Sequence, residues 1–197
     1  MIRVIAAIAA AWALTVLFAG CASTSAHLYT LSASSSAASN PDPSLSKLVI
    51  VIGPVLIPAI VDVPQIVVRN GPNQVTLDEF NRWASPLKNN IAQVVADDLV
   101  AMLGASRVSS ALSMDADYRV AIDVQIFESA PGDAATLSAL WSVRRVKDNK
   151  TESGRTVDRE PVSQKSYEAL AAAHSRALGR LSADIAEAIR ALDHAGQ

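Results

Sequence analysis

Residues 118–144 read YRVAIDVQIFESAPGDAATLSALWSVR, and this stretch decides the fold. Apolar and polar side chains alternate on both sides of the turn signal Pro131-Gly132-Asp133. A period of two predicts half-buried strands, and a short turn between two such strands predicts an antiparallel pair. The expected buried faces consist of Tyr118, Val120, Ile122, Val124 and Ile126 in the first strand, and of Leu137, Ala139, Trp141 and Val143 in the second.

Further strands are expected on both sides of this pair. Residues 48–52 (LVIVI) form a continuous apolar run before Gly53-Pro54, which is typical of a buried strand. The turn signal Asn70-Gly71-Pro72-Asn73 separates residues 65–69 from residues 74–77 and predicts a hairpin. On the carboxyl side we expect a charged loop and then a last strand, over residues 147–159 and 160–166 respectively.

Two long amphipathic helices complete the pattern. The first is predicted between Ser85-Pro86, with serine as the N-cap, and Gly104, a favourable stop. The second is an alanine-rich segment from Tyr167 to Asp193 with one apolar stripe. This order of elements predicts an α+β fold, in which an antiparallel sheet carries two long helices packed on one face. We expect a single domain of this kind over residues 47–197.

The amino terminus carries the signature of a bacterial lipoprotein. Arg3 precedes residues 4–18, a charge-free apolar run that is shorter than the roughly 20 residues of a membrane-spanning helix. The run ends in Leu17-Phe18-Ala19-Gly20-Cys21, where small residues precede the only cysteine of the chain. We expect residues 1–20 to be a signal peptide and Cys21 to be lipidated, with acyl chains such as palmitate as the membrane anchor. An ordinary secretory signal followed by an incidental cysteine is the alternative.

Residues 21–46 are predicted to form a tether. Their serine- and alanine-rich composition cannot bury much surface. Within them, residues 27–31 (HLYTL) alternate like a short strand, which we expect to pair with a sheet edge.

Ala22 follows Cys21 directly, where an aspartate would indicate retention in the inner membrane. The sequence therefore predicts a protein anchored in the outer membrane, on its periplasmic face.

The composition excludes several other functions. A net charge of −2 provides no basic surface for nucleic acid. One cysteine and three histidines leave little material for a metal site, and no glycine-rich phosphate loop is present. His174 lies on the apolar stripe of the last helix and is expected to pack in the core, while Asp97-Asp98 is expected to be solvated. We therefore expect no catalytic residue, no metal site and no cofactor.

A proline-rich apolar surface is the stronger functional signal. Residues 57–61 (IPAIV) and 63–66 (VPQI) carry more hydrophobic area than a proline-broken edge segment usually needs. Trp83 follows at a junction between loop and helix, where it is either a core plug or an anchor for a partner. An exposed sheet edge beside such residues is suited to recruit a neighbouring subunit.

Several motifs taken together resemble a known family. The chain is similar to the ABC-type transport auxiliary lipoproteins, the PqiC/YmbA-like family, over roughly Tyr29 to Leu192. The motifs that carry the resemblance are Tyr29-Thr30-Leu31, Gly53-Pro54-Val55, Ile57-Pro58-Ala59, Asp62-x-Pro64-Gln65-Ile66-Val67-x-Arg69, Phe80-x-Arg82-Trp83-Ala84-x-Pro86-Leu87, Asp117-Tyr118-Arg119-Val120, Ala139-x-Trp141 and Leu181-Ser182-x-Asp184-Ile185-Ala186.

This resemblance implies a non-enzymatic accessory subunit of a lipid-transport system. The implied partners are an MCE-domain protein that spans the envelope and an inner-membrane transport component, which together move lipids between the membranes and preserve membrane integrity. A homo-oligomeric ring is also implied. Val63 stands where family members often carry a basic residue, which weakens any charge-based contact at this loop. The residues expected to contact a subunit or partner are Ile57, Pro58, Asp62, Pro64, Gln65, Arg69, Arg82 and Trp83.

Two other functions share part of these features. A structural or regulatory lipoprotein that binds a cell-wall synthesis enzyme would have the same anchor, tether and α+β domain. An envelope hydrolase would need a nucleophile with a base within reach, and the sequence supplies no such pair.

Overall fold

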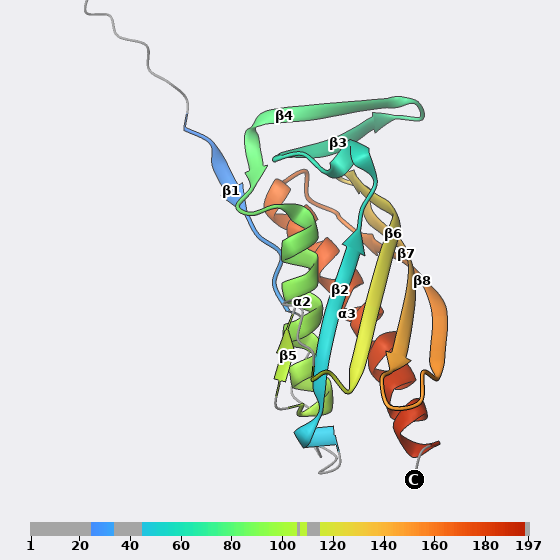
Figure 1. Ribbon diagram of the computed structural model, residues 1–197. Coiled ribbons are helices and arrows are strands. Elements are labelled where there is room, and N and C mark those ends of the chain that lie inside the picture. Colours follow the sequence, from blue (N-terminus) through green and yellow to red (C-terminus); the bar gives the residue numbers. More distant parts are fainter. Residues whose placement is uncertain (1–24, 34–44, 106, 110–114, 196–197) are drawn as a thin grey trace, which may run out of the picture.

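The computed structural model describes residues 25–33, 45–105, 107–109 and 115–195. Within these ranges the chain forms one eight-stranded mixed sheet and two long helices, so the predicted α+β class is confirmed (Figure 1). The elements are β1 (His27–Tyr29), η1 (Leu45–Lys47), β2 (Val49–Leu56), η2 (Ala59–Val61), β3 (Gln65–Gly71), β4 (Gln74–Trp83), α2 (Leu87–Leu103), β5 (Arg107–Ser109), β6 (Tyr118–Ala130), β7 (Ala134–Arg145), β8 (Thr151–Pro161) and α3 (Tyr167–His194).

Strand β6 holds the sheet together. It pairs antiparallel with β7 from Tyr118 opposite Arg145 to Ala130 opposite Ala134, as the alternating pattern predicted. On its other side β6 pairs with β2 and, through Val68 and Ser129, with β3. The hairpin of β3 and β4 therefore continues the sheet, and in Figure 1 it lies across one end of the molecule.

The sheet is mixed, whereas the sequence predicted antiparallel pairing. Strands β2 and β6 run parallel, as do β2 and β5, β1 and β4, and β3 and β6. Hairpin signals reveal only pairs that are adjacent in the chain. The parallel pairs join distant segments, because α2 and the β3–β4 hairpin intervene between β2 and β6. Long crossover connections of this kind are what parallel pairing requires.

A bulge in β6 overturns one prediction about its buried face. Val124 pairs with Ala139, but the next pair is Ile126 with Ser138, so Gln125 is an extra residue in β6. One inserted residue reverses the side-chain alternation beyond it. Ile126 was expected to be buried and is instead 45% exposed, while Phe127 takes the inward position.

The last strand also differs from the prediction. Residues 151–161 form β8, which pairs with β7 along its whole length, where a charged loop was expected up to residue 159. Strand β8 pairs with β7 alone, so it is an edge strand of the described sheet. Thr156 is the one buried residue within residues 151–161. Without an apolar face, the strand gives no period-two hydrophobic signal.

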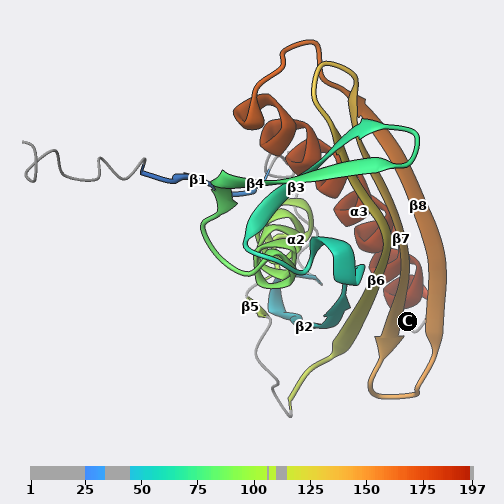
Figure 2. The same ribbon diagram turned by 90° about the horizontal axis from the view of Figure 1, so that it is seen from above.

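Helices α2 and α3 lie on the concave face of the curved sheet (Figure 2). Gly104 ends α2 in the left-handed conformation, as predicted, with φ 66° and its N–H bonded to the Val100 carbonyl. The start differs by one residue, because Pro86 rather than Ser85 occupies the N-cap. Helix α3 begins after Ser166, whose hydroxyl accepts a bond from the Ala169 N–H at 3.1 Å.

The two helices bury their apolar faces against the sheet and against each other. Polar contacts also join the two helices: Ser182 Oγ donates to Asp98 Oδ2 at 3.0 Å, and Arg190 Nη2 donates to the Met102 carbonyl at 2.9 Å. Asp98 is fully buried, so the expectation that it is solvated was wrong. The largest fully buried side chains are Tyr118, Ile50, Ile52, Ile66, Leu87, Ile91, Leu99, Leu103, Ile122, Leu137, Leu170 and Leu178.

The described part of the expected tether contributes to the fold. Strand β1 pairs in parallel with the end of β4, which confirms the predicted strand in residues 27–31. Leu31 and Leu45 are buried in the core. The expected signal peptide, Cys21 and the middle of the tether lie outside the described residues. Among the described residues, no helix is long and apolar enough to cross a membrane.

Gly154 offers a test of the packing between β7 and β8. It lies opposite Trp141, and a Cβ at this position would overlap the indole ring. We predict that Gly154→Ala lowers the free energy of unfolding by about 1–3 kcal/mol, as overpacking does. Gly71→Ala is the matched control, since its Cβ would meet only the Gln74 Cβ at 3.9 Å. Urea unfolding measures both, and equal losses would contradict this packing.

Candidate functional site

The predicted contact residues gather at the end of the molecule where the β3–β4 hairpin crosses the sheet. Asp62, Pro64 and Trp83 line one pocket of about 440 Å³ there, together with the start of α2. Lys88 in the first turn of α2 binds Asp62 at 3.1 Å across the rim. The structure thus brings together residues from the segment before β3, the end of β4 and α2.

Trp83 is a core plug that forms the floor of this pocket. Its side chain is 6% exposed and packs edge-to-face on Phe127, with ring centroids 6.2 Å apart. Its backbone N–H donates to the Pro64 carbonyl at 2.8 Å, and the next N–H, of Ala84, donates to Tyr29. Trp83 therefore fixes the position of the proline segment and of β1.

Glu79 gathers two other predicted residues at the bend of β4. Its carboxylate accepts hydrogen bonds from Gln65 Nε2 at 3.1 Å and from Arg82 Nη2 at 3.2 Å. Arg82 Nε also donates to the Glu79 carbonyl at 2.8 Å. Arg82 is thereby held at the surface by its neighbours. Glu79 itself was not predicted as a contact residue; its position near Arg82 was the available signal.

A second, smaller pocket of about 220 Å³ is lined by residues of η2, the β3–β4 hairpin and the second half of β6. Pro58 and Arg69 line it, and Arg69 forms an ion pair with Glu128 of β6. Ile57 packs against the core beneath this segment. The eight predicted residues therefore lie in separate small clusters, and two of them, Ile57 and Trp83, pack against the core.

Exposed apolar side chains surround this second pocket and continue along the convex face of the sheet. Sequence reasoning missed most of them, because period-two patterns place residues on a face without showing that the face lacks a cover. These exposed residues are Leu56, Ile60, Val75, Ile126, Leu140 and Val157, and we call them the convex apolar patch.

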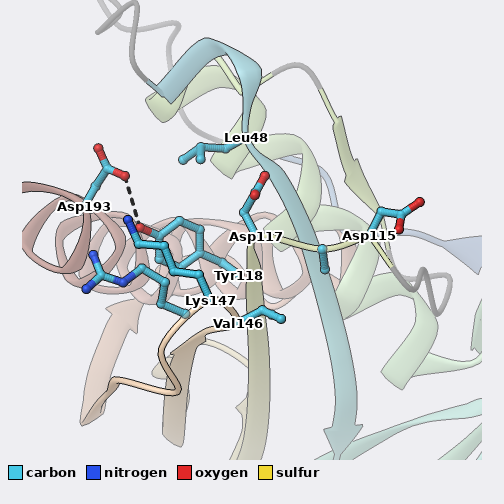
Figure 3. A pocket seen from close by; sticks show the side chains of 9 residues that line it. Leu48, Asp115, Asp117, Tyr118, Val146, Lys147 and Asp193 are labelled. Atoms are coloured by element: carbon cyan, nitrogen blue, oxygen red, sulfur yellow. Dashed lines mark hydrogen bonds between the residues drawn. The ribbon is translucent and has the colours of Figure 1, made fainter. Parts of the chain in front are cut away.

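A polar pocket of about 320 Å³ lies at the opposite end of the sheet (Figure 3). Tyr118 donates to Asp193 at 3.2 Å, and burial raises the pKa of Tyr118 to about 12. Arg145 binds both oxygens of Asp148, which lowers the Asp148 pKa to about 2. Arg145 also donates to the Leu192 carbonyl. These contacts fix the last turn of α3, and a cation there is favoured by the helix dipole.

A buried serine–histidine pair lies in the core between β6 and α3. Ser129 Oγ lies 2.8 Å from His174 Nε2, and the Phe127 ring stacks on the imidazole with centroids 3.8 Å apart. Burial lowers the pKa of His174 to about 3. His174 is 0% exposed, so no substrate reaches the pair. It is a packing contact, as the apolar stripe predicted.

Across the described ranges, His, Cys, Asp and Glu side chains form no cluster of three or more that could hold a metal ion.

The comparison with protein families identifies the chain. The model of the ABC-type transport auxiliary lipoprotein component matches residues 29–186. The chain belongs to this family. Among curated proteins, none matches this chain significantly.

Solved structures share the fold of this auxiliary lipoprotein. Protein XCC0632 from Xanthomonas campestris, of the DUF330 family, superposes with a TM-score of 0.67 at 22% identity, over 87% of this chain and 100% of that one. A crystal structure of an uncharacterized protein gives 0.66 at 18% identity, over 84% and 99%. At these identities the likeness concerns the fold alone.

His174 predicts a pH dependence of stability in the auxiliary lipoprotein. Its pKa is about 3 when folded and, by the ordinary value, about 6.5 when unfolded. Between these values the unfolded state binds a proton that the folded state does not, so stability falls as the pH falls. From pH 7 to pH 5 we expect this group to cost about 2 kcal/mol of unfolding free energy.

Urea unfolding at both pH values measures this loss. His174→Gln, which retains a polar partner for Ser129, is expected to remove this part of the pH dependence. His194→Gln, at the exposed end of α3, is the control and is expected to retain it. If all three proteins lose the same stability on acidification, the loss comes from other groups.

Proposed function

We propose that this chain is an outer-membrane-anchored lipoprotein on the periplasmic face, and that it acts as a non-enzymatic accessory subunit of an MCE-type intermembrane lipid-transport system. Such a system maintains membrane integrity. The match to the auxiliary lipoprotein family over residues 29–186 is the observation that carries this proposal. Cys21, after the charge-free residues 4–18, supports the anchor. On this proposal residues 1–20 are the signal peptide, residues 21–46 begin with the lipidated Cys21 and include strand β1, and residues 47–197 form the main part of the folded domain.

The eight predicted contact residues, from Ile57 to Trp83, are proposed to face the neighbouring subunits of a ring, an MCE-domain protein or an inner-membrane transport component. Asp62, Arg69 and Arg82 offer partly exposed side chains for direct contacts. Pro58, Pro64 and Gln65 shape the segment between them, and Ile57 and Trp83 support it from below. The convex apolar patch adds the hydrophobic area that a stable interface needs.

The absence of enzymatic activity is proposed on chemical grounds. A serine nucleophile needs a histidine base and an open path for the substrate. The described residues do place Ser129 beside His174, but both side chains are buried, and burial lowers the pKa of His174 so far that the imidazole is a weak base. The Ser129 Oγ–His174 Nε2 distance is that of a catalytic dyad, but a substrate has no open path to the pair.

Affinity purification of the lipidated protein from mild detergent tests the partner. We expect an MCE-domain protein in the eluate, identified by mass spectrometry. We expect Arg69→Glu to lower its yield at least several-fold, because the change places like charges beside Glu128 at the surface. Arg176→Glu is the matched control: Arg176 pairs with Glu160 on the helix side and has similar exposure, so its yield should stay unchanged.

The outcome of this purification separates the candidate functions. Both ion pairs are exposed and contribute little to stability, so both variants should remain folded. Recovery of a cell-wall synthesis enzyme without any MCE-domain protein would favour the regulatory alternative. Equal yields from both variants would remove Arg69 from the interface.

Fractionation of cell membranes tests the anchor. Cys21→Ser removes the acylated thiol, and we expect the protein to leave the outer-membrane fraction, because the acyl chains are its proposed anchor there. Ala22→Asp retains the cysteine but introduces the residue that favours inner-membrane retention, so we expect it to sediment with the inner membrane. Wild-type protein in the inner-membrane fraction would contradict the proposed location.

A further inference from the structure

Two exposed apolar side chains lie at the corner where β1 meets β4. Leu28 is 65% exposed and Phe80 is 50% exposed. Leu28 pairs with Arg82, and Phe80 lies two residues before Arg82, in the bend of β4 where the β3–β4 register shifts between Ile66–Asp78 and Gln65–Arg82. The neighbouring pair of Tyr29 and Trp83 faces the interior instead. The corner is therefore built with an apolar outer face.

This corner is the described part of the fold that follows soonest after the proposed anchor. His27, the first residue of β1, comes six residues after Cys21 in the sequence. Six extended residues span at most about 20 Å. Strand β6, with 13 residues, is about 40 Å long, and its start lies at the other end of the molecule. A short tether thus keeps the corner, rather than the polar pocket near Tyr118, close to the bilayer.

The basic side chains near the corner are paired within the protein, and the acidic Glu168 of α3 lines a pocket with Leu28. Arg82 binds Glu79, and Lys88 binds Asp62. These contacts leave no excess of basic side chains among the described neighbours of Leu28 and Phe80 to attract anionic lipids. Attachment at this corner would therefore come from apolar contact and would depend little on salt.

We propose that the corner formed by Leu28 and Phe80 lies against the lipid bilayer that holds the acyl chains, and that it orients the domain on the membrane. This inference rests on the proposed lipidation of Cys21. Two partly inserted side chains would bind a membrane weakly in isolation. The anchor makes the contact intramolecular, so its effective concentration is high and a weak contact is sufficient.

Fluorescence quenching in vesicles tests the orientation. Because Cys21 is the only cysteine and is acylated in the lipidated protein, an introduced cysteine is the only free thiol. Leu28→Cys and Phe80→Cys receive an environment-sensitive fluorophore. Val157→Cys is the control, since Val157 is 64% exposed on the convex face of β8, away from the corner. The full-length lipidated proteins are reconstituted into phosphatidylethanolamine vesicles with some phosphatidylglycerol and a headgroup-region spin-labelled lipid.

We expect the labels at positions 28 and 80 to lose most of their emission and the label at 157 to retain its emission. Raising the salt concentration or omitting phosphatidylglycerol should leave this difference unchanged. Equal quenching at all three positions, or none at 28 and 80, would overturn the proposal. So would an emission change at 28 and 80 in vesicles without spin label and no quenching with it, because that result indicates contact with another protein copy.

Co-sedimentation in the same samples separates this inference from the proposed function. Protein that sediments with vesicles but shows no quenching at 28 and 80 retains its anchor and refutes the orientation alone. Protein that fails to sediment refutes the anchor, and the orientation with it. The double variant Leu28→Ser/Phe80→Ser should sediment normally and retain the wild-type melting temperature, since both side chains are exposed.

Discussion

The bulge at Gln125 in β6 is the constraint on which the core packing near the β3–β4 hairpin depends. The inserted residue turns Ile126 to the convex face and Phe127 to the interior. Phe127 then stacks on His174 and supports the edge of Trp83. Without the insertion, the aromatic cluster that joins the sheet, α3 and the proline segment would have no central member. One local irregularity therefore determines both the core packing and the exposed apolar face.

The helices and the local strand pairs could be predicted from the sequence. Helical periodicity and Gly104 located α2, and the alternation around Pro131-Gly132-Asp133 located β6 and β7, because both signals depend on residues near each other in the chain. The parallel pairs could not be predicted, since they join residues far apart in the chain, such as Ile50 and Tyr118, and no local pattern marks such a pair. Strand β8 was missed because its pairing depends on backbone bonds to β7 and not on an apolar face.

The candidate surface was predicted in outline and not in detail. Proline and apolar residues in segment 57–66 indicated where it lies, and Trp83 indicated its junction with α2. Composition does not reveal how charges pair, so the division of Asp62, Arg69 and Arg82 among three different partners was beyond the sequence. Buried polar contacts were equally hidden, as Asp98 illustrates: a carboxylate in a polar pair gives no sign that a serine of α3 lies opposite.

The attachment of β1 has a mechanical consequence. Its parallel ladder with β4 covers three residue pairs. Two side chains also bind the backbone just after β1: Asn90 accepts a hydrogen bond from the Leu31 N–H at 2.8 Å, and Ser175 accepts one from the Ser32 N–H at 3.1 Å. Asn90 belongs to α2 and Ser175 to α3. With an anchor at Cys21, any pull from the membrane would enter the fold at β1 and be shared between the sheet and both helices. The load would then act on the whole domain instead of peeling away one edge strand.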